Sequence, residues 1–264
     1  MKNTILKYSS LLALLGSPLI STQTYAAECA TGTAPTEGCT IDVSNITYTL
    51  TGDIEPAAGT RGIEFTIDAD SNILNLTGDI TTSGGANGLY LNTSDSNTTN
   101  LTGNITTAGN GATGLRLHES DSNITNLTGN ISTEGHYAYG LLLNKSDSNT
   151  TNLTGNITTI GNVGNGLILA YSDSNITSLT GNITTAGDGA QGLYLFDSES
   201  NITSLTGNIT TTGDSAQGLY IFDSNSNTIY MTGNITTSED NSSGFELHNS
   251  ESNTINMTGN INTS

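Results

Sequence analysis

The sequence of 264 residues has no tryptophan, three prolines, two cysteines and only five lysine or arginine residues. Hydrophobic residues make up 33% of it and aromatic residues 5%, whereas a compact domain uses about 45–50% apolar residues, glycine included. Glycine is frequent, at 31 residues. This composition argues against a doubly wound enzyme fold and, with so little proline, against a collagen-like rod. It leaves a disordered chain or a repeat protein with a thin core.

Long hydrophobic runs are also absent, apart from a short one near the N-terminus. Lys2 and Lys7 form a positive region, an apolar run follows at residues 11–15, and Thr24-Tyr25-Ala26 has the pattern of a cleavage site. The run is shorter than the ~20 residues that span a bilayer. We therefore predict a Sec-type signal peptide at residues 1–26 and no transmembrane segment in the mature chain. The protein is expected to be exported and to reside at the cell surface, at the outer membrane or outside the cell.

Positive charge is scarce in the predicted mature chain. Without the signal peptide, three basic residues (Arg61, Arg116 and Lys145) stand against 24 acidic ones, a formal net charge of −21. Nucleic acids and anionic lipids are bound by clusters of lysine and arginine. We therefore expect no nucleic-acid partner.

The two cysteines, Cys29 and Cys39, lie just after the predicted cleavage site. An exported protein meets an oxidising environment, in which such a pair forms a local disulfide. No histidine accompanies the pair, so a metal site is not expected there. We interpret residues 27–45 as an N-terminal cap segment containing this disulfide.

An internal repeat is the strongest signal in the chain. The triad Leu-Thr-Gly recurs every 26 residues, with a single step of 25, and continues as Met-Thr-Gly. The triads start at Leu50, Leu76, Leu101, Leu127, Leu153, Leu179, Leu205, Met231 and Met257. A second marker, Gly-Leu-x-Leu, recurs with the same period. Such self-similarity is typical of solenoids, in which each unit buries its apolar face only against its neighbours.

Each repeat alternates apolar and polar residues, which is typical of β-strands. In the stretch from Leu127 to Ser132, the residues Leu127, Gly129 and Ile131 are predicted to share one face. Glycine at this inward position suggests a bend or a close backbone approach. We predict an all-β, right-handed parallel β-helix of about eight 26-residue coils over residues 46–264. A column of asparagines should stack along it at Asn123, Asn149, Asn175, Asn201, Asn227 and Asn253.

These motifs resemble the β-helical passenger region of autotransporters, the proteins of type V secretion. The resemblance rests on the signal peptide, the early cysteine pair and units such as residues 182–193, Asn-Ile-Thr-Thr-Ala-Gly-Asp-Gly-Ala-Gln-Gly-Leu. It covers roughly residues 40–264 and implies a scaffold that can carry adhesins, enzymes or toxins. In that family a translocator barrel follows the passenger. This chain ends at Ser264 within a predicted coil, so we expect the barrel to be lacking.

The variable position x of Gly-Leu-x-Leu and its neighbour are the first candidate binding site. They place aromatic residues outside the predicted core, and we select Tyr90, Tyr194, Phe196, Tyr220 and Phe222. Exposed apolar stripes often bind partners. The alternative is that these side chains only stabilise the sheet through pairs between coils.

Polar columns offer further candidates. The pattern Thr102, Asn104, Thr106 repeats along the chain and resembles an ice-binding hydroxyl array, although a solvated polar strand face is the favoured interpretation. Asp95, Asp121, Asp147 and Asp173 recur at one turn and could bind Ca²⁺ between coils, or imitate the carboxylate pair of a glycosidase. The favoured interpretation of these four aspartates is a solvated turn.

His118, His136 and His248 have no accompanying departure from the repeat, so we predict neither catalysis nor a cofactor.

These observations favour an exported scaffold for adhesion, to a host cell or between cells. Its partner would be a protein or glycan on a cell surface. Three alternatives stay open: an enzyme that acts on polysaccharides, an ice-binding solenoid, and a truncated passenger fragment without a function of its own.

Overall fold

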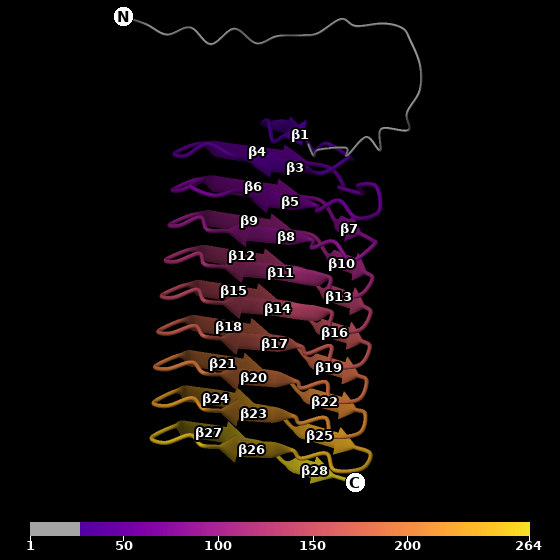
Figure 1. Ribbon diagram of the computed structural model, residues 1–264, viewed down its shortest axis with the longest axis vertical. Helices are drawn as coiled ribbons and strands as arrows, with labels where there is room; N and C mark the ends of the chain where they lie inside the picture. Colours follow the sequence, from indigo (N-terminus) through magenta and orange to yellow (C-terminus); the bar gives the residue numbers. More distant parts are fainter. Residues whose placement is uncertain (1–26) are drawn as a thin grey trace, which may run out of the picture.

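The computed structural model describes residues 27–264, and the predicted signal peptide lies outside these residues. The described chain forms an all-β parallel solenoid of about nine coils without helices. The coils stack from the N-terminal to the C-terminal end in Figure 1. The predicted parallel β-helix is therefore confirmed, with about nine coils in place of the expected eight.

Three parallel sheets run along the solenoid; sheets A and B have ten strands each and sheet C has eight, because sheet C begins two coils later. Sheet A contains β1 (Ala27–Glu28), β3 (Cys39–Ile41), β5 (Ile63–Phe65), β8 (Leu89–Asn92), β11 (Thr113–His118), β14 (Tyr139–Asn144), β17 (Leu167–Ala170), β20 (Leu193–Phe196), β23 (Leu219–Phe222) and β26 (Phe245–His248). Sheet B contains β2 (Gly32–Thr33), β4 (Thr47–Thr51), β6 (Ile73–Thr77), β9 (Thr98–Thr102), β12 (Ile124–Thr128), β15 (Thr150–Thr154), β18 (Ile176–Thr180), β21 (Ile202–Thr206), β24 (Thr228–Thr232) and β27 (Thr254–Thr258). Sheet C contains β7 (Ile80–Thr82), β10 (Ile105–Ala108), β13 (Ile131–Glu134), β16 (Ile157–Ile160), β19 (Ile183–Ala186), β22 (Ile209–Thr212), β25 (Ile235–Ser238) and β28 (Ile261–Thr263).

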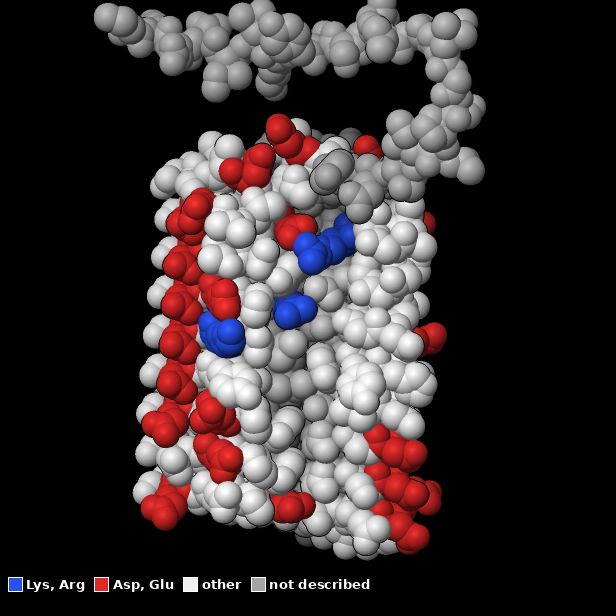
Figure 2. Space-filling model, viewed as in Figure 1, with Lys and Arg blue, Asp and Glu red and all other residues white. Residues whose placement is uncertain are grey.

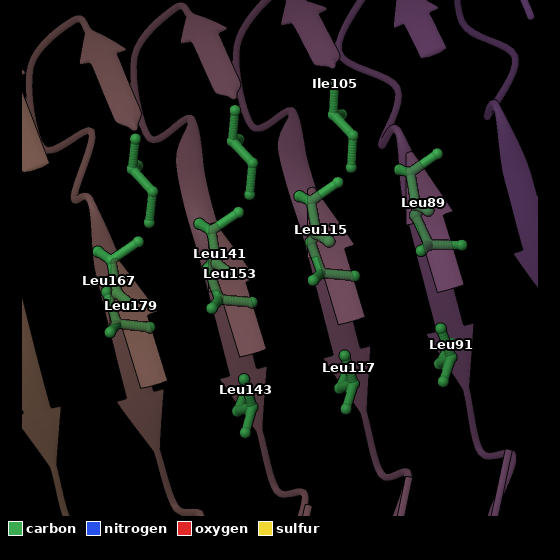
Figure 3. Packing of buried hydrophobic residues seen from close by; sticks show 14 of the residues in the cluster. Leu89, Leu91, Ile105, Leu115, Leu117, Leu141, Leu143, Leu153, Leu167 and Leu179 are labelled. Carbon is green, nitrogen blue, oxygen red and sulfur yellow. The ribbon is translucent and has the colours of Figure 1, made fainter. Parts of the chain in front are cut away.

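The repeats are in register, so equivalent residues pair from coil to coil. Leu127 of β12 pairs with Leu101 and Leu153 on either side, as the period predicts. Figure 3 shows the resulting core, in which matching leucines and isoleucines of successive coils lie one above another. Leu127 is 2% exposed and Ile131 is fully buried. A narrow apolar column thus stabilises a long surface, which explains the low hydrophobic content.

The Leu-Thr-Gly-Asn-Ile stretch differs from its prediction. Leu127 and Ile131 both point inward, but they belong to different sheets, because β12 ends at Thr128 and β13 begins at Ile131. Gly129 lies between them with φ of 151°, a conformation that side chains disfavour. The glycine that suggested a bend is in fact the corner between sheets B and C.

The cap segment 27–45 continues the solenoid. β1 and β3 pair with each other and β3 pairs with β5, while β2 pairs with β4. The predicted disulfide is present between Cys29 and Cys39. It therefore joins the first strands of sheet A, at the N-terminal end of the core.

A column of threonines lies inside sheet B without hydrogen-bond partners. The hydroxyls of Thr99, Thr125, Thr151, Thr177 and Thr203 are buried and unpaired. The same inward position holds Leu74 before this run and Ile229 after it. An apolar side chain therefore fits the position, and the hydroxyls add a desolvation cost.

We expect Thr151→Val to raise the free energy of unfolding by about 1 kcal/mol, because it removes an unpaired buried hydroxyl and keeps the shape of the side chain. The matched control is Thr154→Val in the same strand, where the hydroxyl faces solvent and the change should stay within about 0.5 kcal/mol. Urea unfolding followed by circular dichroism measures both. A loss of stability in Thr151→Val would show that its hydroxyl is paired in solution.

Candidate functional site

The variable residues of sheet A form two outward columns. The first, at the x position of Gly-Leu-x-Leu, contains Glu64, Tyr90, Arg116, Leu142, Ile168, Tyr194, Tyr220 and Glu246. The second lies two residues further along each strand and contains Asn92, His118, Asn144, Ala170, Phe196, Phe222 and His248. Both columns face outward because the leucines between them point into the core.

These columns lie in a groove and do not form the exposed stripe that the sequence predicts. Tyr90 and Ile168 are each only 5% exposed, and Tyr194 and Phe196 are half-buried. The groove has a volume of about 400 Å³ around β14, β17 and β20. The face of the molecule in Figure 2 is hollowed along its middle, between turns that stand higher on both sides. We call this feature the sheet A groove.

The second wall of the groove was not foreseen. Asn165 and Gln191 line it from the segments that lead from sheet C into sheet A, together with Tyr139 at the start of β14. Gln191 donates to the side-chain oxygen of Gln217 on the next coil at 3.0 Å. The signal for these residues was present, because glutamine or asparagine stands directly before the marker glycine in several repeats.

Aromatic side chains stack along the groove from coil to coil. The rings of Tyr194 and Tyr220 are parallel, with centroids 5.1 Å apart, and those of Phe196 and Phe222 are 5.6 Å apart. His248 continues the second column 4.8 Å from Phe222. The structure thus brings four of the five predicted aromatic residues together in β20 and β23, and it places Tyr90 separately in β8.

At the other end of the groove, Tyr90 is enclosed by arginines. The guanidinium carbon of Arg61 lies 4.4 Å from the centroid of the Tyr90 ring, and that of Arg116 lies 5.2 Å from it. Glu64 forms an ion pair with Arg61. The Nε atom of Arg116 is buried without a hydrogen-bond partner.

Burial in the groove raises the pKa of its tyrosines further above neutral pH. Burial raises the pKa of the Tyr194 hydroxyl to about 12, and the nearby Tyr220, Tyr171 and Asp223 add to the shift. Burial also raises the pKa of Tyr90, while Arg116 and Arg61 act in the opposite direction. At neutral pH these phenols are therefore uncharged hydrogen-bonding groups.

The four predicted calcium ligands lie in an exposed column at the turn between sheets A and B. Their carboxylates are used within the turn, because Oδ1 of Asp121 accepts the N–H of Asp147 and Oδ1 of Asp147 accepts the N–H of Asp173, each at 2.7 Å. Asp95 accepts the N–H of Asp121 in the same way. Burial and the carboxylates of Asp147 and Asp95 raise the pKa of Asp121, against the effect of its backbone hydrogen bond. Within residues 27–264, no three potential metal ligands converge. Calcium binding here stays an untested alternative to a solvated turn.

The proposed hydroxyl array does not form one flat face. Thr102 belongs to β9 of sheet B, whereas Thr106 belongs to β10 of sheet C. Asn104 lies at the corner, where its Oδ1 accepts the N–H of Asn130 at 2.9 Å. The pattern therefore bends around the corner made by Gly103, whose φ is 151°. The expectation of a single hydroxyl plane was wrong.

The three histidines occupy separate places. Nδ1 of His118 lies 2.9 Å from Oδ1 of Asn144, and His136 accepts the N–H of Asn162 at the opposite turn. His248 stacks on Phe222. No pair of them shares a site in the structure.

The described residues contain no helix long and apolar enough to cross a membrane. We found no match for this chain among protein-family models, curated proteins or solved structures.

Proposed function

We propose that this chain is an exported scaffold of the autotransporter-passenger type that mediates adhesion at the cell surface. The sheet A groove is the proposed binding face, and its partner is a protein or glycan on another cell. The observation that supports this most is the variation among the repeats within sheet A. The x position changes between acidic, aromatic, basic and aliphatic residues, while the stacking residues beneath it stay almost constant.

The outer faces of sheets B and C vary at fewer positions, and Tyr230 is the one aromatic residue among the outward strand residues of these two sheets in the described chain. The last residue of the long sheet B strands is threonine in every coil from Thr51 to Thr258. The first residue of these strands is isoleucine or threonine, which have similar shapes. In sheet C the second residue of each strand is threonine or serine in all strands but β28, whereas the fourth residue varies and includes Ala108, Glu134, Ile160 and Thr212. Outward aromatic residues are thus concentrated on sheet A, and hollow aromatic surfaces are common at binding sites.

The proposed function predicts a loss of adhesion when the aromatic side chains are removed. In the variant with Tyr194, Phe196, Tyr220 and Phe222 changed to serine, binding of the labelled chain to host cells or to sister cells should fall by at least about tenfold. Flow cytometry measures this binding directly.

A matched control keeps the interpretation clear. Ile176 and Ile202 are paired, exposed apolar residues on sheet B, so Ile176→Ser with Ile202→Ser removes apolar surface on a different face. This control should adhere like the wild type. Thermal unfolding of each variant checks that the solenoid persists at the assay temperature, and Phe196→Ser with Phe222→Ser replaces the fourfold variant if that one unfolds. Normal adhesion of a folded groove variant would refute the proposed function.

A further inference from the structure

The two ends of the sheet A groove differ in charge. All three basic residues of the described chain, Arg61, Arg116 and Lys145, appear on the face in Figure 2, toward its N-terminal end. The other end, formed by β20 and β23, has carboxylates in the turns on both sides of the groove. Asp197 and Asp223 follow the strands on one side, and Asp188 and Asp214 lie in the turns on the other. We call this part of the groove its acidic half.

One carboxylate of the acidic half, that of Asp223, acts on both stacked tyrosines, whose pKa values are raised mainly by burial. Asp223 contributes to the raised pKa of both Tyr194 and Tyr220, and Glu246 contributes to that of Tyr220. The carboxylates of Asp223 and Glu246 are therefore close enough to these tyrosine rings to change their electrostatic environment. A cation against these rings would meet both the ring faces and the carboxylates.

The N-terminal end of the groove shows what such a surface contacts. Tyr90 occupies the same position of the repeat as Tyr194 and Tyr220, and its ring is covered by Arg61 and Arg116 with Glu64 alongside. In the described residues, cation–π contacts are confined to Tyr90. The chain thus contains one tyrosine already paired with guanidinium groups, and two equivalent tyrosines beside carboxylates.

We infer that the acidic half of the groove binds an extended, arginine-bearing peptide segment of a partner protein. This inference rests on the proposed function and names the chemistry of the partner. Guanidinium groups would stack on Tyr194 and Tyr220 and pair with Asp197 and Asp223, while apolar side chains between them would contact Phe196 and Ile168. A neutral glycan could also stack on the rings, but it would leave the charge of both walls without a partner. The net charge of the chain further attracts cationic segments from solution.

The test uses a fluorescein-labelled octapeptide of alternating arginine and leucine with the purified chain. Fluorescence anisotropy should show saturable binding that weakens with added salt. Asp197→Asn with Asp223→Asn should weaken binding by about tenfold. This pair preserves the turn, because Asn249 holds the same position with the same left-handed backbone, φ of 47° against 46°. Tyr194→Leu with Tyr220→Leu should weaken it by about fivefold, and Leu142 shows that leucine fits this column.

The matched control removes two charges elsewhere. Asp53 and Asp79 lie at the corner between sheets B and C, where later coils have asparagine. Asp53→Asn with Asp79→Asn should leave the dissociation constant within about twofold, since these charges lie away from the groove. An equal loss of peptide affinity in the two double variants would mean that the peptide responds only to the net charge of the chain, and it would overturn the inference.

Other occupants give distinct results. If cellohexaose binds and Tyr194→Leu with Tyr220→Leu abolishes that binding while the peptide does not bind, the partner is a glycan and the inference is wrong, yet the proposed function stands. Sedimentation tests whether the chain dimerises. A dimer that is lost in the variant Asp197→Asn with Asp223→Asn would assign the groove to a second copy of the chain, and would also overturn the inference. Binding of the matching glutamate–leucine peptide would have the same consequence. Failure of the proposed function itself is a separate result, namely normal cell adhesion of the folded serine variant.

Discussion

Gly129→Ala should lower the free energy of unfolding by at least about 4 kcal/mol, among the largest effects expected of a single substitution in this chain. A Cβ atom at Gly129 would overlap the carbonyl group of Gly103 on the preceding coil. The obstacle is backbone that is held by the stacking of the coils, and not a flexible side chain that could move away. The left-handed φ of 151° adds its own strain. Urea unfolding with linear extrapolation measures the change.

Gly111→Ala separates the two causes. Gly111 also has a positive φ, of 76°, but a Cβ atom built there meets nothing within 4 Å. Its replacement should cost only about 1 kcal/mol, the strain of the backbone alone. If Gly129→Ala cost no more than Gly111→Ala, the coils could not approach each other at this corner as closely as the structure has them.

The same glycine shows how far the sequence could lead. The 26-residue period predicted that Leu127 would stack between Leu101 and Leu153, and this holds because identical units can bury their apolar residues only by meeting in register. The alternation around Gly129 predicted one strand. Two strands separated by a corner keep Leu127 and Ile131 inward equally well, so alternation alone cannot distinguish a straight strand from a bent one.

The groove was harder to predict than the core, and for a physical reason. The outward direction of Tyr194 and Phe196 followed from strand alternation, and the structure agrees. Their partial burial depends on how high the neighbouring turns stand, including the wall that carries Gln191. The repeat pattern does not reveal the shape of these turns, in which residues such as Asp197 have a left-handed backbone, with φ of 46°. The position of Arg61 and Arg116 over Tyr90 likewise required the spacing between coils.

The buried asparagine column leads to the second large effect. The predicted stacking of amides is present, and its geometry is directional. Oδ1 of Asn149 accepts the backbone N–H of Asn123 at 2.8 Å, while the N–H of Asn149 donates to Oδ1 of Asn175 at 2.8 Å. Asn123 and Asn149 are each 1% exposed. These side chains therefore replace the backbone hydrogen bonds that the turn between sheets A and B cannot make.

We expect Asn149→Leu to lower the free energy of unfolding by about 3 kcal/mol. Leucine has a similar size, but it leaves the buried N–H of Asn123 without an acceptor. It also removes the hydrogen bond from Nδ2 of Asn149 to Oδ1 of Asn175. Chemical unfolding measures the loss, and amide exchange at Asn123 should accelerate, since this N–H is then free to open.

Asn152→Leu is the control, because it separates buried amide ladders from exposed ones. Nδ2 of Asn152 donates to Oδ1 of Asn126 at 2.9 Å, on the solvent side of sheet B. Water can replace this bond, so its loss should change the free energy of unfolding by no more than about 0.5 kcal/mol. Equal costs for the two substitutions would mean that the loss of an acceptor for the buried backbone N–H of Asn123 is not what makes Asn149 costly to replace.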